Sequence, residues 1–164
     1  LNIIKDPYTN LSNTFPEGYK FIAHWKAVQE RQREKYGTSD VQASIAVAKE
    51  LAVNERVLFL LGNKQFIQNV ATVNSNDYEL KICSYADQRV APDGILSIRQ
   101  RLTEAASRYE GVVGASINAP NSQELISKAE EIEKQLFIFI KRRPEEINND
   151  SIAPYVKNLR NYHL

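Results

Sequence analysis

Apolar residues recur three and four positions apart along most of the chain, and no segment shows the strict alternation of a half-buried strand. A spacing of three and four places apolar side chains on one face of a helix. The pattern therefore predicts an all-α fold, a helical bundle of about six to eight helices. The first long helix is predicted over residues 19–36, where Trp25 and Val28 share a face and Gly37 is the stop signal.

Capping residues divide the rest of the chain. Ser39 and Asn76 are each followed three residues later by Gln or Glu, a spacing typical of helix N-termini. They predict helices that continue to Leu51 and to Arg89. Other helices are expected at residues 55–61, 64–72, 95–109, 121–142 and 151–162, the last with Pro154 in its first turn. The predicted buried side of helix 121–142 consists of Leu125, Ala129, Ile132, Leu136 and Ile140.

Charge and composition exclude several classes of protein. The formal net charge of +1 gives no general attraction to nucleic acid or to a membrane surface. The short basic run at residues 141–143 ends a helix, where cations offset the helix dipole, so no nucleic-acid partner is expected. A single cysteine, Cys83, excludes a disulfide framework and fits a reducing cytoplasm. No apolar run is long enough to span a bilayer, so a soluble cytoplasmic protein is expected.

Asp87 does not fit an ordinary exposed helix position. Apolar residues nearly encircle its helix, and Cys83 and Ser84, four and three residues earlier, share its face. The carboxylate is therefore expected to point into the protein, where an unpartnered charge is very costly. Two interpretations remain open. The carboxylate pairs with an arginine such as Arg99 or Arg101 or caps a neighbouring helix, or it binds a metal ion.

Three other residues have chemistry to offer. Cys83 shares the face of Asp87, but a cysteine on an apolar helix usually serves as core. His24 has no metal-ligating partner at helical spacing, so we expect an exposed or half-buried position on its helix. Arg89 lies about 200° around the helix from Asp87, which favours an ion pair with the next helix over contact with a substrate phosphate.

The segment from Glu79 to Pro92 resembles a sequence pattern of a known protein family. It contains the run Tyr85-Ala86-Asp87-Gln88-Arg89-Val90 and is followed by Ile95, Ser97, Arg101-Leu102, Glu104 and Arg108-Tyr109. This pattern resembles the closing segment of the HD-domain metal-dependent phosphohydrolases, in one branch of which Tyr-Ala-Asp and Arg-Val precede an Arg-Leu helix that ends in Arg-Tyr. Weaker similarity extends the match over residues 1–110, through Asn2-Ile3-Ile4-Lys5, Trp25-Lys26-Ala27-Val28-Gln29, Glu34-Lys35-Tyr36-Gly37 and Ala46-Val47-Ala48-Lys49-Glu50-Leu51.

The resemblance implies a fold and a reaction. HD domains are helical bundles that hold a divalent metal ion with a His, an adjacent His-Asp pair and a final Asp. By this resemblance Asp87 is the final metal ligand, and the substrate is a nucleotide or another small phosphate ester. If the site exists, the guanidinium of Arg89 is a candidate contact for the substrate phosphate, although its place on the helix favours an ion pair. Residues 1–110 would form the HD-like domain without its N-terminal metal-ligand helices. Residues 111–164 lie outside the resemblance. Because this segment has an apolar stripe, we expect it to be a helical extension that covers one side of the bundle or mediates homodimerisation.

The histidines depart from the HD pattern. The sequence has no His-Asp pair, and its two histidines, His24 and His163, do not lie where the family's metal ligands fall. In the register of the resemblance the chain begins just after the His-Asp pair, and three of the four ligands are missing from it. Three explanations remain open: these ligands lie outside this chain, they have been lost, or they have degenerated. If those ligands exist, the protein is expected to be a hydrolase. The alternative is a non-catalytic helical domain that binds a partner or ligand.

Overall fold

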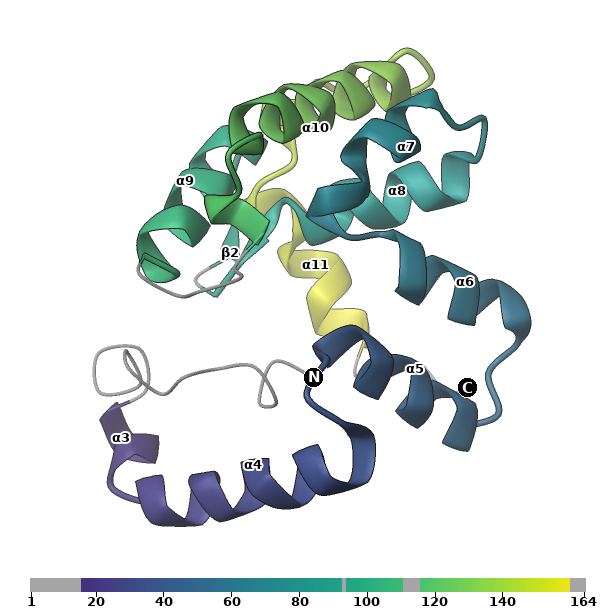
Figure 1. The fold of residues 1–164 in the computed structure, drawn as a ribbon. Helices are drawn as coiled ribbons and strands as arrows, with labels where there is room; N and C mark the ends of the chain where they lie inside the picture. The colour runs from purple at the N-terminus through teal and green to yellow at the C-terminus, as the bar shows by residue number, and fades with distance from the viewer. Residues whose placement is uncertain (1–15, 93, 111–115, 160–164) are drawn as a thin grey trace. The chain divides into compact units, whose positions relative to one another are not determined.

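The computed structural model describes residues 16–92, 94–110 and 116–159 (Figure 1). The connection at 111–115 and His163 lie outside the described residues, as does the segment 1–15. Within the described ranges the chain is helical apart from one hairpin of two-residue strands, so the all-α class is confirmed. The chain divides into two compact units between Asn63 and Lys64. The domain boundary predicted after residue 110 stays a prediction.

The first unit is built from helices that follow their local signals. Gly37, with a φ of 82°, ends α4 as predicted, and the Ser39 side chain caps α5 by accepting a hydrogen bond from the backbone N–H of Gln42. Asn54 caps α6 through the N–H of Val57 at 3.0 Å. The helices are α3 (Pro16–Tyr19), α4 (Ile22–Tyr36), α5 (Asp40–Glu50) and α6 (Glu55–Asn63), with α5 packed on both α4 and α6.

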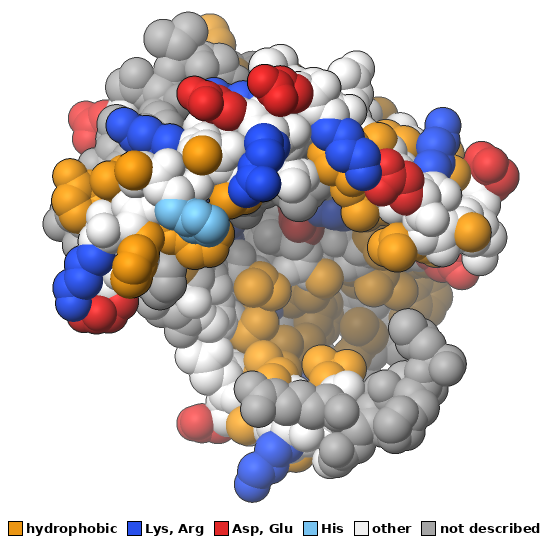
Figure 2. All heavy atoms as spheres, turned by 90° about the horizontal axis from the view of Figure 1, so that it is seen from below, with side chains coloured by type: hydrophobic (Ala, Val, Ile, Leu, Met, Phe, Trp, Pro, Cys, Tyr) orange, Lys and Arg blue, Asp and Glu red, His pale blue; other side chains and the backbone are white. Residues whose placement is uncertain are grey.

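Exposed groups join α4 to α5. Lys35 Nζ lies 3.0 Å from a carboxylate oxygen of Glu50, and the Tyr36 hydroxyl donates to the same carboxylate at 2.9 Å. These hydrogen bonds, from Lys35 first and Tyr36 second, lower the pKa of Glu50. His24 is exposed, as predicted, with its ring edge-to-face against Trp25. Figure 2 shows orange hydrophobic side chains exposed among blue cations, with the pale blue of histidine beside them.

The second unit is centred on α10, which packs against α7, α8 and α9 (Figure 1). Its strands pair antiparallel, with Val90 opposite Ile95 and Ala91 opposite Gly94. The sequence pattern did not predict this hairpin, because two residues are too few to show alternation. The elements are η1 (Phe66–Gln68), α7 (Asn69–Asn74), α8 (Tyr78–Asp87), β1 (Val90–Ala91), β2 (Gly94–Ile95), α9 (Ile98–Arg108), η2 (Ser116–Asn118), α10 (Ser122–Phe137), η3 (Pro144–Glu146) and α11 (Asn149–Leu159).

Two hydrophobic clusters form the core of the second unit. One joins α9, η2 and α10 through Ile98, Leu102, Ala105, Ile117, Ile126 and Ala129. The other joins α7 and α10 through Val73, Ile132 and Leu136. The predicted buried side of α10 is confirmed from Leu125 to Leu136. Its extension to Ile140 was wrong, because the helix ends at Phe137 and the Phe139 N–H turns back to the Leu136 carbonyl, leaving Ile140 exposed.

Several helix starts also differ from the prediction. Helix α9 begins at Ile98 and not at residue 95, because Ile95 belongs to β2, and α4 begins at Ile22 and not at residue 19. The cap of α8 is Asp77, whose carboxylate accepts from the Leu80 N–H at 3.1 Å, and not Asn76. The last helix starts at Asn149, so Pro154 lies in its second turn and removes one backbone donor there. None of the described helices has both the length and the apolar composition that crossing a bilayer requires.

Candidate functional site

Asp87 is the last residue of α8, and its side chain is 50% exposed. The prediction that this carboxylate points into the protein was wrong. The buried face of α8 is formed by Leu80 and Ser84 and continues to Gln88, whose side chain lies about 100° around the helix from that of Asp87. The arginines considered as partners bind elsewhere, Arg99 to Glu130 and Arg101 to Glu104.

Lys64 is the partner of Asp87. Its ammonium nitrogen lies 2.6 Å from Asp87 Oδ1, and the Lys64 side chain is 30% exposed. A pair this open to solvent contributes about 0–1 kcal/mol to stability. In the part of the chain that the structure describes, no three His, Cys, Asp or Glu side chains gather closely enough to hold a metal ion.

A buried polar network fixes the residue next to Asp87. The Asn69 amide donates to Gln88 Oε1 at 2.8 Å and to the Leu125 carbonyl at 3.0 Å, and Gln88 Nε2 donates back to Asn69 Oδ1 at 2.9 Å. Gln88 Nε2 also donates to Ser84 Oγ at 2.8 Å. The network joins α7, the end of α8 and α10, so Gln88 cannot turn outward without leaving buried polar groups unsatisfied.

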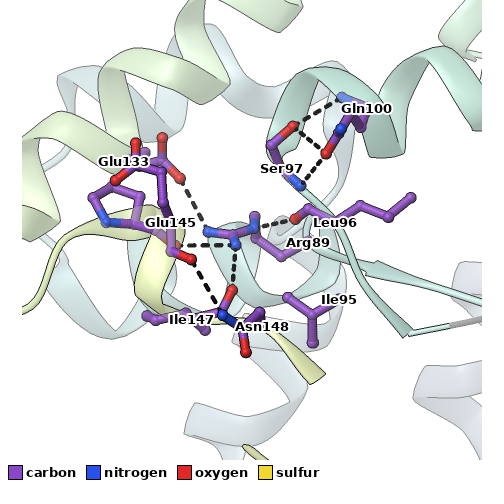
Figure 3. A pocket seen from close by; sticks show the side chains of 10 residues that line it. Arg89, Ile95, Leu96, Ser97, Gln100, Glu133, Glu145, Ile147 and Asn148 are labelled. Atoms are coloured by element: carbon purple, nitrogen blue, oxygen red, sulfur yellow. Dashed lines mark hydrogen bonds and ion pairs between the residues drawn. The ribbon is translucent and has the colours of Figure 1, made fainter. Parts of the chain in front are cut away.

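Arg89 is buried, only 4% exposed, and directs its guanidinium into the second unit (Figure 3). An arginine has five N–H donors. All five have protein acceptors: the carbonyls of Leu96, Pro144 and Ile147, the Tyr85 hydroxyl and the Glu133 carboxylate. The predicted ion pair forms, but with Glu133 of α10 and not with the next helix. The expected contact with a substrate phosphate has no donor left in this arrangement.

The environment of Arg89 shifts the pKa of two acids. Burial raises the pKa of Glu133, and this effect outweighs the hydrogen bond from Tyr85 and the charge of Arg89, which both lower it. The charge of Glu145 raises the pKa of Glu133 further. Burial also raises the pKa of Tyr85. Desolvation therefore dominates at this cluster, where the carboxylate is held near a cation that does not fully compensate its loss of water.

A cavity of about 250 Å³ lies beside this cluster. Its walls come from β2, the first turn of α9, α10 and the segment around η3 (Figure 3). Ser97 and Gln100 form the capping box of α9 on one side, and Glu133 and Glu145 face them from the other. Arg89 lines this cavity and Asp87 does not. The structure thus separates the two predicted site residues, one directed inward and one outward.

Several residues of the site were not found from the sequence. Lys64 and Asn69 come from another part of the chain than Asp87 and Gln88, and neither has a motif. For Glu133 the sequence held one weak indication of a partly buried charge, which is its position directly after the buried Ile132 of α10. Cys83, predicted as core, is half-buried.

No known protein family matches the sequence. No curated protein and no solved structure matches the chain either. The resemblance to HD-domain phosphohydrolases therefore rests on the residues of the chain itself, chiefly the run from Tyr85 to Val90.

Proposed function

We propose that this chain is part of an HD-type metal-dependent phosphohydrolase and that Asp87 is one ligand of its divalent metal ion. One observation carries the proposal. Within the run from Tyr85 to Val90, Gln88 and Arg89 are buried and saturated with protein contacts, whereas the carboxylate of Asp87 is half exposed with one ion pair. The fold gives every other polar side chain of this run a structural contact inside the protein and leaves Asp87 available.

The neighbours of Asp87 support this role, because they hold its backbone from both sides. The hydrogen bond between Gln88 and Ser84 anchors the buried face of α8. Two residues after Asp87, the side chain of Arg89 is held by the Ile147 carbonyl. A metal ligand acts well only when the surrounding residues fix its position. A carboxylate on a rigid helix end, with its own oxygens outside the core network, meets that requirement.

The remaining ligands would come from outside the described residues. A divalent cation held by imidazole and carboxylate groups lowers the pKa of a bound water until it can attack a phosphate ester. Asp87 would supply one oxygen donor to the metal ion, and in this structure the ammonium group of Lys64 balances the charge of its carboxylate. We propose a nucleotide or another small phosphate ester as the substrate and the cytoplasm as the compartment, which the single Cys83 fits.

The test is phosphate release by the full-length natural protein from nucleotides and small phosphate esters, with Mg²⁺, Mn²⁺ or Co²⁺ supplied. Asp87→Asn keeps the shape of the side chain and removes its charge, and we expect it to lower kcat by at least about 100-fold. The matched control, Lys64→Gln, breaks the same ion pair and is expected to stay active. Equal activity of Asp87→Asn and the wild type would contradict the proposal.

A second function, partner binding without catalysis, has one observation in its favour. Ile138 and Phe139, just after α10, are 77% and 70% exposed. Exposed apolar residues of this size are typical of interaction surfaces, including those between two copies of a chain. If the protein releases no phosphate, a Phe139→Ser variant that shifts its sedimentation from dimer to monomer would support this function.

A further inference from the structure

The segment from Pro144 to Asn149 is fastened to the chain that follows Asp87. Arg89 donates to the Ile147 carbonyl at 2.8 Å and to the Pro144 carbonyl at 3.3 Å. These partners lie 58 and 55 residues away in the sequence. A segment near the C-terminal end of the described chain therefore contacts the residue two positions after the proposed metal ligand.

Asn149 makes a second attachment, to the hairpin. Its Oδ1 accepts a hydrogen bond from the Ile95 N–H at 2.7 Å. At Gly94, where φ is 128°, a Cβ atom would lie 2.3 Å from that same oxygen. The hairpin thus has a glycine where the Asn149 side chain approaches, and a larger residue at this position would force that side chain to move.

Arg89 connects these attachments to α8. Its Nε donates to the Leu96 carbonyl, just past β2, and its guanidinium also contacts Glu133 of α10. The backbone after Asp87 is consequently held at Arg89 by α10 and by the C-terminal segment, and at Ile95 by Asn149. Loosening the C-terminal segment would remove two of the five acceptors of a buried guanidinium, which is costly.

We infer that residues 144–149 are a brace that positions Asp87 through Arg89, so that the C-terminal extension controls the proposed metal site. The inference rests on the proposed function for its consequence, but the brace itself is a property of the fold. Arg89 is thereby a positioning residue. The role of the extension is to hold the end of α8 in place for the metal.

Helix α11, which continues from the brace, is held by few buried apolar contacts and can therefore change more easily than the brace itself. No described residue of α11, which follows the brace, is buried, and Tyr155 and Leu159 on α11 are about two-thirds exposed, at 64% and 65%. Segments with few buried apolar contacts open locally at low free-energy cost. A change at α11 can therefore be transmitted to residues 86–96 through the hydrogen bonds of Arg89 and Asn149.

The test compares Asn149→Ala with Asn158→Ala, a matched removal of an exposed amide from α11. Hydrogen exchange in the full-length natural protein is measured over residues 86–96, and Mn²⁺ affinity is measured by calorimetry. For Asn149→Ala we expect exchange over 86–96 to rise about fivefold, the equivalent of one lost hydrogen bond, and Mn²⁺ affinity to fall in parallel. Asn158→Ala is expected to change neither.

A second variant separates the possible outcomes. Arg89→Lys keeps the positive charge beside Glu133, but its ammonium group cannot reach all five acceptors. We therefore expect it to raise exchange over 86–96 and to lower Mn²⁺ affinity by more than Asn149→Ala does. Faster exchange confined to residues 144–159, or faster exchange over 86–96 with unchanged Mn²⁺ affinity, would overturn the inference. If the wild type itself binds no Mn²⁺, the proposed function fails, and the exchange over 86–96 alone decides whether the brace exists.

Discussion

The side-chain amides of Asn69 and Gln88 hydrogen-bond to each other in both directions, at 2.8 and 2.9 Å. Both residues are buried, with 0% and 4% exposure. Reciprocal pairing satisfies two amides that would otherwise lose water without compensation, and it fixes α7 against the end of α8. This pair is the part of the core nearest in sequence to Asp87, so its loss should affect both stability and the proposed site.

Asn69→Leu should destabilise the protein by about 2–4 kcal/mol, because it leaves the Gln88 amide oxygen buried without its donor and removes a hydrogen bond to the Leu125 carbonyl. Urea unfolding monitored by circular dichroism measures the change. The double variant Asn69→Leu/Gln88→Leu should cost less than the sum of the two single variants, since it removes both halves of the pair. Additive losses would show that the two amides are not coupled.

Gly94→Ala should destabilise the protein by about 1–3 kcal/mol, because the new Cβ would lie 2.3 Å from Asn149 Oδ1 on a backbone with a φ of 128°. Removing the obstructing amide in Gly94→Ala/Asn149→Ala should recover part of the loss. The control is Gly62→Ala, within helix α6, where alanine is favoured over glycine. Its Cβ would lie 3.5 Å from the Ile45 side chain, an ordinary contact, so the variant should be neutral or slightly stabilising. Equal effects at the two glycines would contradict the close approach of Asn149.

Glu133 should make stability depend on pH in the direction opposite to an ordinary paired carboxylate. Because burial raises its pKa above 4.5 in the folded state, its contribution is fully present below the unfolded pKa and is lost as pH rises through the folded pKa. Glu133→Gln, which keeps an acceptor for Arg89 and Tyr85, should remove this decline. Unfolding free energies measured from about pH 4 to about pH 8 test it. A variant with the same slope as the wild type would assign the dependence to other groups.

Local signals predicted much of the fold. The glycine at 37, the cap at Ser39 and the apolar stripe of α10 up to Leu136 each act within a few residues, so the sequence reveals them directly. The end of α10 was placed too late, because Ile138, Phe139 and Ile140 continue the apolar pattern while the backbone turns away.

The candidate site was less predictable because its contacts are distant in sequence. Lys64 lies 23 residues from Asp87, and Glu133 lies 44 residues from Arg89. Apolar residues around α8 suggested a buried Asp87, but Gln88 occupies the core position instead, through its pairing with Asn69. Neither helical periodicity nor capping rules encode which polar residue finds an amide partner on another helix.

Whether Asp87 binds a divalent metal ion can be measured from the metal content of the full-length natural protein. Asp87→Asn and Lys64→Gln would be purified beside the wild type and titrated with Mn²⁺, with folding checked by circular dichroism. Both variants lose the same 2.6 Å ion pair, so a structural role alone predicts the same result for both. We predict that Asp87→Asn loses bound metal while Lys64→Gln binds it at least as tightly as the wild type. Equal Mn²⁺ binding by all three proteins would contradict the account.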